Sequence, residues 1–165
     1  MEKESLATKR LGCTTQDILE EMWQEVCERG GSLSFRIVSG SMSPMIEVDD
    51  VVRVSRVEPS RVRIGDIVAF QNGRNVVVHR VIGKSRSAGR LRFRQMGDAG
   101  RSSARFPAQN LIGKVTVVHK EGYEIHLDSP IHVIGNKVIG WRLRLVDFIG
   151  RRLLRRIRRY LRKAF

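Results

Sequence analysis

The sequence has little of what marks several other classes of protein. It holds only 2 cysteines, Cys13 and Cys27, with no second pair and no histidine near either, so neither a disulfide framework nor a zinc site is indicated. No apolar run approaches the roughly 18 to 20 residues that cross a bilayer, and the N-terminus lacks the apolar core of a signal peptide. We therefore expect a cytoplasmic protein without a transmembrane span. Peripheral attachment to a membrane is compatible with this expectation.

Acidic and aromatic residues are also scarce. Asp and Glu number 17 against 31 Lys and Arg, which gives a net charge of +14 and favours an anionic partner, either a nucleic acid or an anionic membrane surface. Aromatic residues make up only 6% of the chain, and no groove-reading motif is present, so nucleic acid is the less favoured of the two. Dinucleotide and phosphate-loop motifs are absent as well, and no cofactor is predicted. The histidines near the end of the β segment, His119, His126 and His132, lack metal-ligand spacing, so no metal site is predicted.

What the chain does have suits one folded domain with short appendages. Its 165 residues are 41% hydrophobic, enough for a core. The patterns divide it into an N-terminal helical segment, 1–32, a β domain, 33–137, and a basic amphipathic C-terminal helix, 138–165. The oligomeric state is left open.

The N-terminal segment has the pattern of one amphipathic helix. Thr14 begins a capping motif that ends at Asp17, and Gly30 follows the last apolar position. Its apolar residues recur at helical spacing: Ile18, Leu19, Met22, Trp23 and Val26. The opposite face is rich in glutamate, which an anionic bilayer repels, so we expect this helix to pack on the body of the protein.

The central segment changes to short β-type runs separated by Gly, Asn, Ser or Pro. These runs are LSFRIV, DVVRVSRV, DIVAF, VVVHRVI, LRFRQM, KVTVVH and YEIHL. They predict a mainly β, antiparallel domain. The clearest turn is Asn72-Gly73, for which the dipeptide predicts a two-residue type I′ hairpin.

The C-terminal segment, from Val138, predicts one or two helices broken near Gly150. In its second half, apolar residues share one face opposite many arginines. Three alternatives fit this pattern: the apolar face packs on the domain with a solvated basic back, the helix lies at an anionic membrane surface, or it contacts nucleic acid.

A candidate nucleophile lies in the stretch from Ser39 to Pro44, SGSMSP. Gly40 permits a tight approach before Ser41, and Pro44 turns the chain out of strand geometry soon afterwards. The backbone N–H of Ser41 and the hydroxyl of Ser39 are candidate donors to one oxyanion. A Ser, Gly and Pro turn is usually structural, so this stretch requires a partner base.

His79 is the candidate base. By strand alternation it shares a face with Val77 and Val81, which predicts a partly buried ring. The run LRFRQM then ends at Gly97-Asp98, where a carboxylate at a strand end is able to orient an imidazole across the sheet, as the third member of a triad does.

Five boxes in this order resemble those of the signal peptidase I superfamily. They are SGSMSP from Ser39, DDVVRV from Asp49, GDIVAF from Gly65, VHRV from Val78 and MGD from Met96. The chain resembles most closely the branch that uses histidine, of archaeal and endoplasmic-reticulum type, and more distantly the fold of the SOS-repressor autopeptidases.

The resemblance implies a Ser–His endopeptidase that cleaves a peptide or preprotein. In that family pattern Ser41 is the nucleophile, His79 the general base, Asp98 the acidic residue of the GD box and Ser39 the oxyanion helper. The alternative is a non-catalytic or self-processing module of the same fold that binds an anionic membrane or nucleic acid.

Overall fold

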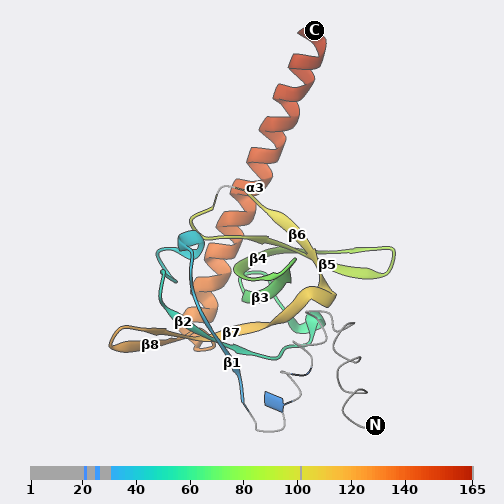
Figure 1. The fold of residues 1–165 in the computed structure, drawn as a ribbon. Helices are drawn as coiled ribbons and strands as arrows, with labels where there is room; N and C mark the ends of the chain where they lie inside the picture. The colour runs from blue at the N-terminus through green and yellow to red at the C-terminus, as the bar shows by residue number, and fades with distance from the viewer. Residues whose placement is uncertain (1–20, 22–24, 27–30, 101, 165) are drawn as a thin grey trace, which may run out of the picture.

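The protein is a mainly antiparallel β structure with one long helix, α3 (Pro130–Ala164), which follows the last strand (Figure 1). The computed structural model describes residues 31–100 and 102–164, together with residues 21, 25 and 26, and no side chain from residue 154 onward is described. The predicted β-rich class is therefore confirmed. Among the described residues, three short 3-10 helices connect strands: η2 (Gly40–Met42), η3 (Pro59–Arg61) and η4 (Ala108–Asn110).

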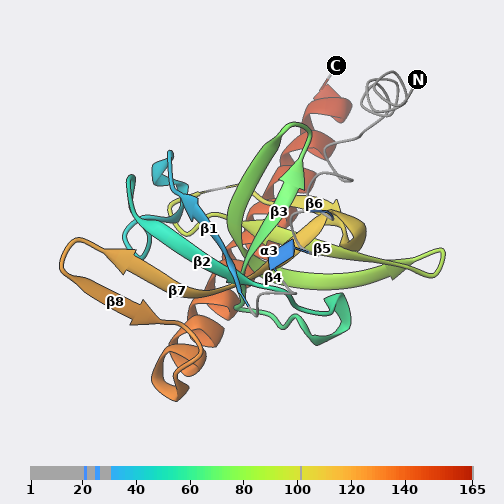
Figure 2. The ribbon, with the colours of Figure 1, turned by 60° about the horizontal axis from the view of Figure 1, so that its bottom comes forward.

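The sheet has eight strands. They are β1 (Leu33–Arg36), β2 (Val51–Ser55), β3 (Ile67–Asn72), β4 (Asn75–Ser87), β5 (Arg90–Met96), β6 (Ala104–Pro107), β7 (Leu111–Lys120) and β8 (Tyr123–His126). Their spatial order is β1-β2-β7-β3-β4-β5-β6, with β8 paired to β7, and each pairing is antiparallel. The β7–β8 hairpin extends to one side and the long β4–β5 hairpin to the other (Figure 2).

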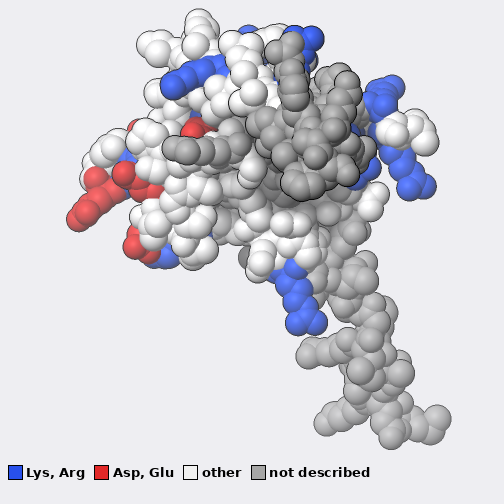
Figure 3. Space-filling model, turned by 90° about the horizontal axis from the view of Figure 1, so that it is seen from above, with Lys and Arg blue, Asp and Glu red and all other residues white. Residues whose placement is uncertain are grey.

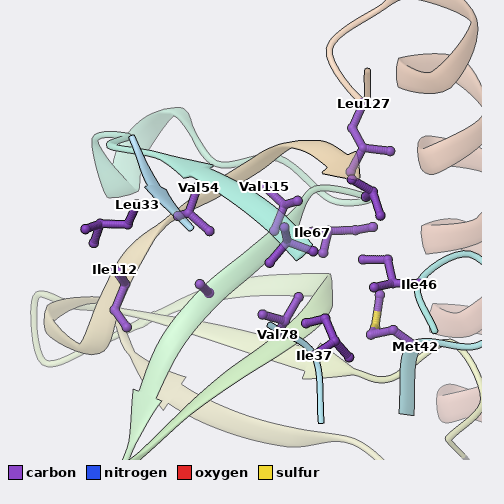
Figure 4. Close-up of a cluster of buried hydrophobic side chains, with 13 residues drawn as sticks. Leu33, Ile37, Met42, Ile46, Val54, Ile67, Val78, Ile112, Val115 and Leu127 are labelled. Carbon is purple, nitrogen blue, oxygen red and sulfur yellow. The ribbon is translucent and has the colours of Figure 1, made fainter. Parts of the chain in front are cut away.

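Strand β3 lies between two hydrophobic cores. Successive side chains of a strand point to opposite faces, so Ile67 and Ala69 enter one core while Val68 and Phe70 enter the other. This burial on both faces explains the unbroken apolar run in the sequence. The larger core also contains Met42 (Figure 4), and the second core includes stacked phenylalanine rings from β3 and β6.

The predicted β3–β4 hairpin is present, but its turn is displaced by one residue. Asn72 pairs with Asn75, so the two-residue loop is Gly73-Arg74. Of these two residues only Gly73 has a positive φ, at 62°. That pattern fits a type II′ turn, whose first central position favours glycine, and the predicted type I′ turn at Asn72-Gly73 is wrong.

Helix α3 differs from its predicted form in two ways. It begins at Pro130, earlier than Val138, because proline suits the first helical position, where its missing N–H costs no bond. It also continues through Gly150 without the predicted break. Its first half packs on β4 and β5, where Ile139 and Leu143 contact Ile82 and Met96.

Two glycines allow α3 to approach the sheet closely. Gly65, which precedes β3, has a φ of 99°, and a Cβ on Gly140 would lie 2.7 Å from its Cα. Side chains at either place would push the helix away. Within the described part of the chain, no helix is both long and apolar enough to cross a membrane.

The predicted N-terminal helix falls mostly outside the described residues. Residues 21, 25 and 26 are helical, and Val26 packs against the larger core. The packing of the helix as a whole, and the division at residue 32, stay predictions.

Candidate active site

The SGSMSP stretch forms a tight turn around η2, which is held in place by side chains buried in the larger core. Met42 and Ile46 are buried in the larger core, and the N–H of Ile46 donates to the carbonyl of Met42 over 3.1 Å (Figure 4). The N–H of Ser43 donates to the carbonyl of Gly40. Because its neighbour Met42 is held in the core, Ser41 stays at the surface with a partly buried side chain.

His79 lies opposite this turn, in the middle of β4. Its partner on β3 is Val68, and its ring is partly buried, as predicted. The Nε2 atom of His79 lies 3.0 Å from Oγ of Ser41. Tertiary folding therefore brings the predicted nucleophile and the predicted base within hydrogen-bond distance of each other.

The other ring nitrogen of His79 contacts a residue that the sequence patterns did not single out. Nδ1 lies 2.5 Å from Oε1 of Gln95, on β5. A carbonyl oxygen only accepts, so Nδ1 carries the proton and donates it to Gln95. Nε2 is then left as the acceptor, and the Ser41 hydroxyl donates to it. Gln95 thus holds the tautomer that a general base requires.

A weak signal for Gln95 is present in the sequence. By alternation along β5 it shares a face with Phe93, which belongs to the second core, and with Leu91, which packs against that core. Gln95 is itself only 8% exposed. A buried amide on an apolar strand face requires a hydrogen-bond partner, and His79 is the matching polar residue on an apolar face of β4.

Burial sets the proton affinity of His79. It lowers the pKa of the ring below its ordinary value of 6.5, whereas the hydrogen bond to Gln95 and the negative charge of Asp98 raise the pKa and only partly offset the effect of burial. The ring is consequently neutral at pH 7. A neutral imidazole is the form that accepts a proton from a hydroxyl.

Asp98 does not make the expected contact with His79. Its carboxylate instead binds the guanidinium of Arg80, with Nε donating to Oδ1 over 2.7 Å and NH2 donating to Oδ2 over 2.6 Å. The Arg80 side chain is fully buried, and that of Asp98 is 7% exposed. Asp98 acts on His79 only through its charge, and Gln95 takes the orienting position expected for it.

The Arg80–Asp98 pair ties several elements together beneath the site. NH1 of Arg80 donates to the carbonyl of Gly65 and to Oδ1 of Asn136 on α3, both over 2.8 Å. NH2 lies 3.4 Å from the sulfur of Met45, in the turn after the nucleophile. Arg80 is the immediate neighbour of His79 on β4, so this network fixes the strand that carries the base.

The segment Gly97–Ala99 also supports the nucleophile. The N–H of Ala99 donates to the carbonyl oxygen of Ser41 over 3.1 Å. A Cβ on Gly97 would overlap that same carbonyl and lie 3.1 Å from Nε2 of His79. The MGD box therefore acts as a backbone support against both Ser41 and His79.

Ser39 lies beside the nucleophile. Its Oγ is 3.4 Å from Oγ of Ser41, and its side chain is solvent-exposed. Ser41 is the second residue of η2, where an N–H has no partner within the helix. Both predicted oxyanion donors are thus near Oγ of Ser41, and their role stays a prediction.

A groove of about 370 Å³ includes Ser41 and His79 in its lining. One wall is the end of β1 and the residues after it, Phe35–Ser39, and the other is the start of β4, Val76–Val78. Among the described residues, β1 is an edge strand that pairs with β2, and β4 pairs with β5 from Arg80 onward. Unpaired strand edges therefore border an apolar groove.

The other described histidines lie away from this site. His119 and His126 face Glu124, at 2.8 and 3.5 Å, and His132 contacts Ser129 before α3. Among the described residues, no group of three or more His, Cys, Asp or Glu side chains is arranged to hold a metal ion.

Comparison with known proteins leaves the identification to these residues. The chain matches no protein-family model, and no curated protein matches it in sequence.

Proposed function

We propose that the protein is a serine endopeptidase of signal peptidase I-like type, with Ser41 as nucleophile and His79 as general base. The observation that carries the proposal is the contact of 3.0 Å between Oγ of Ser41 and Nε2 of His79, with Nδ1 held by Gln95. A nucleophile, a base and a group that orients the base are the three parts of a serine-hydrolase site.

The reaction follows from the protonation states. Oγ of Ser41 attacks the peptide carbonyl while Nε2 of His79 takes the hydroxyl proton, and the resulting oxyanion accepts hydrogen bonds from the Ser41 N–H and the Ser39 hydroxyl. Nε2 then gives its proton to the leaving amine as the C–N bond breaks. Water attacks the acyl-enzyme with His79 again as base, which releases the new carboxylate and restores Ser41.

The groove supports an extended peptide as substrate. Unpaired backbone groups at its strand edges are able to pair with a peptide in β conformation, a common mode of peptide recognition. Its walls are mostly apolar, with Val38 and Val76 exposed at the rim. We expect a peptide or preprotein segment with apolar side chains around the cleaved bond.

The direct test is digestion of a defined peptide mixture. Purified full-length protein is incubated with synthetic peptides, including those encoded by reading frames next to its gene, and the products are sequenced by mass spectrometry. We expect internal cleavage at a restricted set of bonds. If every peptide remains intact under conditions in which the protein is folded, the endopeptidase proposal fails and the non-catalytic alternative stands.

The Gln95–His79 contact makes a prediction about pH. Catalysis requires unprotonated His79, so kcat/KM should rise with pH through a pKa below 6.5 and be flat near neutrality. In Gln95→Glu a carboxylate faces Nδ1 and stabilises the imidazolium, so the pKa rises and the acidic limb moves upward by about one to three pH units. The measurement is kcat/KM against pH for a cleaved peptide.

A matched control adds the same charge elsewhere on the sheet. Gln71→Glu changes a partly buried glutamine near the end of β3, whereas His79 pairs with Val68 near the start of that strand. The acidic limb of the pH profile of this variant should stay near that of the wild type. If the limb of Gln95→Glu also stays in place, Gln95 does not orient the base.

A further inference from the structure

Helix α3 presents its apolar side to solvent. The residues that it turns toward the sheet include Asn136, Gly140, Leu143 and Asp147, a set rich in polar and small side chains. Nine of the thirteen exposed large apolar side chains in the described part of the chain lie on this one helix. They form what we call the outer face: Ile131, Ile134, Val138, Trp141, Leu145, Val146, Phe148, Ile149 and Leu153. A helix on a protein surface normally has the opposite arrangement.

The same helix is strongly basic. From Arg142 to Lys163 the sequence has ten Lys and Arg residues and one acidic residue, Asp147. That carboxylate is buried and already contacts Arg94, Ser103 and Arg151. On the surface drawn in Figure 3, acidic side chains gather at one side of the molecule, whereas lysines and arginines are spread over the rest. The outer face is therefore apolar within a positively charged setting.

A groove of about 350 Å³ adjoins the outer face, between α3 and the β4–β5 strands. Its lining includes Arg94, Arg144 and Arg151 with Asp147 as the one carboxylate, so the lining is net positive. The guanidinium of Arg144 lies 4.9 Å from the centre of the Trp141 ring, and none of the described carboxylates forms a salt bridge with it.

The groove and the outer face share side chains. Trp141, Leu145 and Phe148 line the groove and are also exposed on the outer face. One ligand that uses both features has an anionic head and an apolar tail. The groove is suited to the phosphate of a phospholipid, and the outer face is suited to its acyl region, with Trp141 at the boundary between the two.

Two other occupants use only part of this surface. A second copy of the chain would bring two strongly basic helices together, and their repulsion opposes pairing. A nucleic acid would neutralise the arginines but would leave the exposed Ile, Val and Leu side chains in water. An anionic bilayer matches both the charge and the apolar area.

We propose that α3 is an interfacial membrane helix, which lies with its outer face in an anionic bilayer and places a phospholipid phosphate in the groove beside Arg144. This interaction goes beyond the proposed peptidase activity and does not depend on it. It selects the membrane from the three alternatives that the sequence leaves open for this helix.

The test is flotation of full-length protein with vesicles. We expect binding to vesicles of phosphatidylcholine mixed with phosphatidylglycerol, and about tenfold or greater weakening on phosphatidylcholine alone, because each basic residue near an anionic surface adds to attraction. Trp141→Glu should reduce binding to the mixed vesicles by about tenfold or more, since it places a charge in the apolar face. Tyr123→Glu is the matched control, because both aromatic side chains are 58% exposed, and it should bind as the wild type does.

A second variant and a spectroscopic signal locate the lipid. Arg144→Gln should weaken binding to the mixed vesicles more than Lys137→Gln, which removes an exposed charge of the same helix outside the groove. The chain has 2 tryptophans, so in a Trp23→Phe background the emission reports Trp141 alone and should shift to the blue with the mixed vesicles. Inorganic phosphate should not reproduce this shift.

Several results overturn the proposal. The first is equal binding of wild type and Trp141→Glu to the mixed vesicles, or no binding by either. The second is a dimer in analytical ultracentrifugation that Trp141→Glu abolishes, which assigns the outer face to a second copy. The third is binding of duplex DNA that Arg144→Gln weakens while vesicles remain unbound.

Discussion

Ser41→Ala is expected to abolish peptide cleavage while the fold survives. The substitution removes the hydroxyl that we propose as the nucleophile, and loss of a serine nucleophile costs roughly 10⁴- to 10⁶-fold in kcat in enzymes of this chemistry. Ser41 lies at the surface, and the substitution removes its hydrogen bond to His79 but leaves its backbone contacts in place. Thermal unfolding should therefore change by no more than the worth of one hydrogen bond, about 1 kcal/mol. Cleavage is measured by mass spectrometry of a peptide substrate, and folding by circular dichroism.

Two further variants serve as comparisons for Ser41→Ala: one at His79, which contacts Ser41, and one at Ser43, in the same turn. His79→Ala should lose cleavage to a similar extent, because serine and histidine act as one unit and their effects are not additive. Ser43→Ala should retain it, since the Ser43 backbone, and not its side chain, holds the turn. Full activity in Ser41→Ala, or equal loss in Ser43→Ala, would contradict the assignment of the nucleophile.

The largest expected effect on stability belongs to Asp98→Ala. The guanidinium of Arg80 is fully buried, so removal of its carboxylate partner leaves an uncompensated positive charge in the interior. Breaking one partner of a buried ion pair costs about 3 to 5 kcal/mol in the free energy of unfolding. Urea denaturation measures this as a lower midpoint for the variant.

An exposed pair serves as the control for Asp98. Asp49 lies 3.8 Å from Arg36, its side chain is 79% exposed, and its φ of 72° suits Asp or Asn, so Asp49→Asn should change the free energy of unfolding by less than about 1 kcal/mol. If Asp98→Ala instead unfolds like the wild type but loses cleavage, Asp98 serves the chemistry directly and the structural role is wrong. The Gln95 variants separate the two roles further, because Gln95 contacts the histidine itself.

Strand positions could be predicted from the sequence where alternation and turn residues agree. Seven of the eight strands correspond to runs chosen from composition and period, and the eighth, β6, was missed. It has four residues, ends at Pro107 and lies at the edge of the sheet, so it has neither the length nor the apolar alternation that marks a strand. The turn of the β3–β4 hairpin lies one residue later than predicted, because Asn72 pairs with Asn75. The register of a hairpin is therefore set by the pairing of its two strands and not by the turn dipeptide alone.

The candidate site could be predicted only in part. Ser41 and His79 are candidates from the sequence alone, because both residue types are chemically distinctive and lie in ordered boxes, and their catalytic roles stay predictions. Gln95 was not found, because its role depends on the diagonal contact between two strands, which no local pattern contains. For Asp98, the sequence indicates a carboxylate near the site but not its partner: the predicted contact is with His79, and the observed one is with Arg80. A guanidinium binds a carboxylate through two hydrogen bonds and therefore binds it better than an imidazole does.

By itself, the sequence determined the β class, the basic character of the C-terminal helix, and the serine and histidine that we propose for catalysis. These follow from local properties: side-chain period, charge and the chemistry of single residues. Only the tertiary structure decided that Gln95 orients His79, that Asp98 supports the fold through Arg80, and that the apolar side of α3 faces outward. Each of these depends on which surfaces meet across long separations in the chain, and that is set by packing of the whole domain.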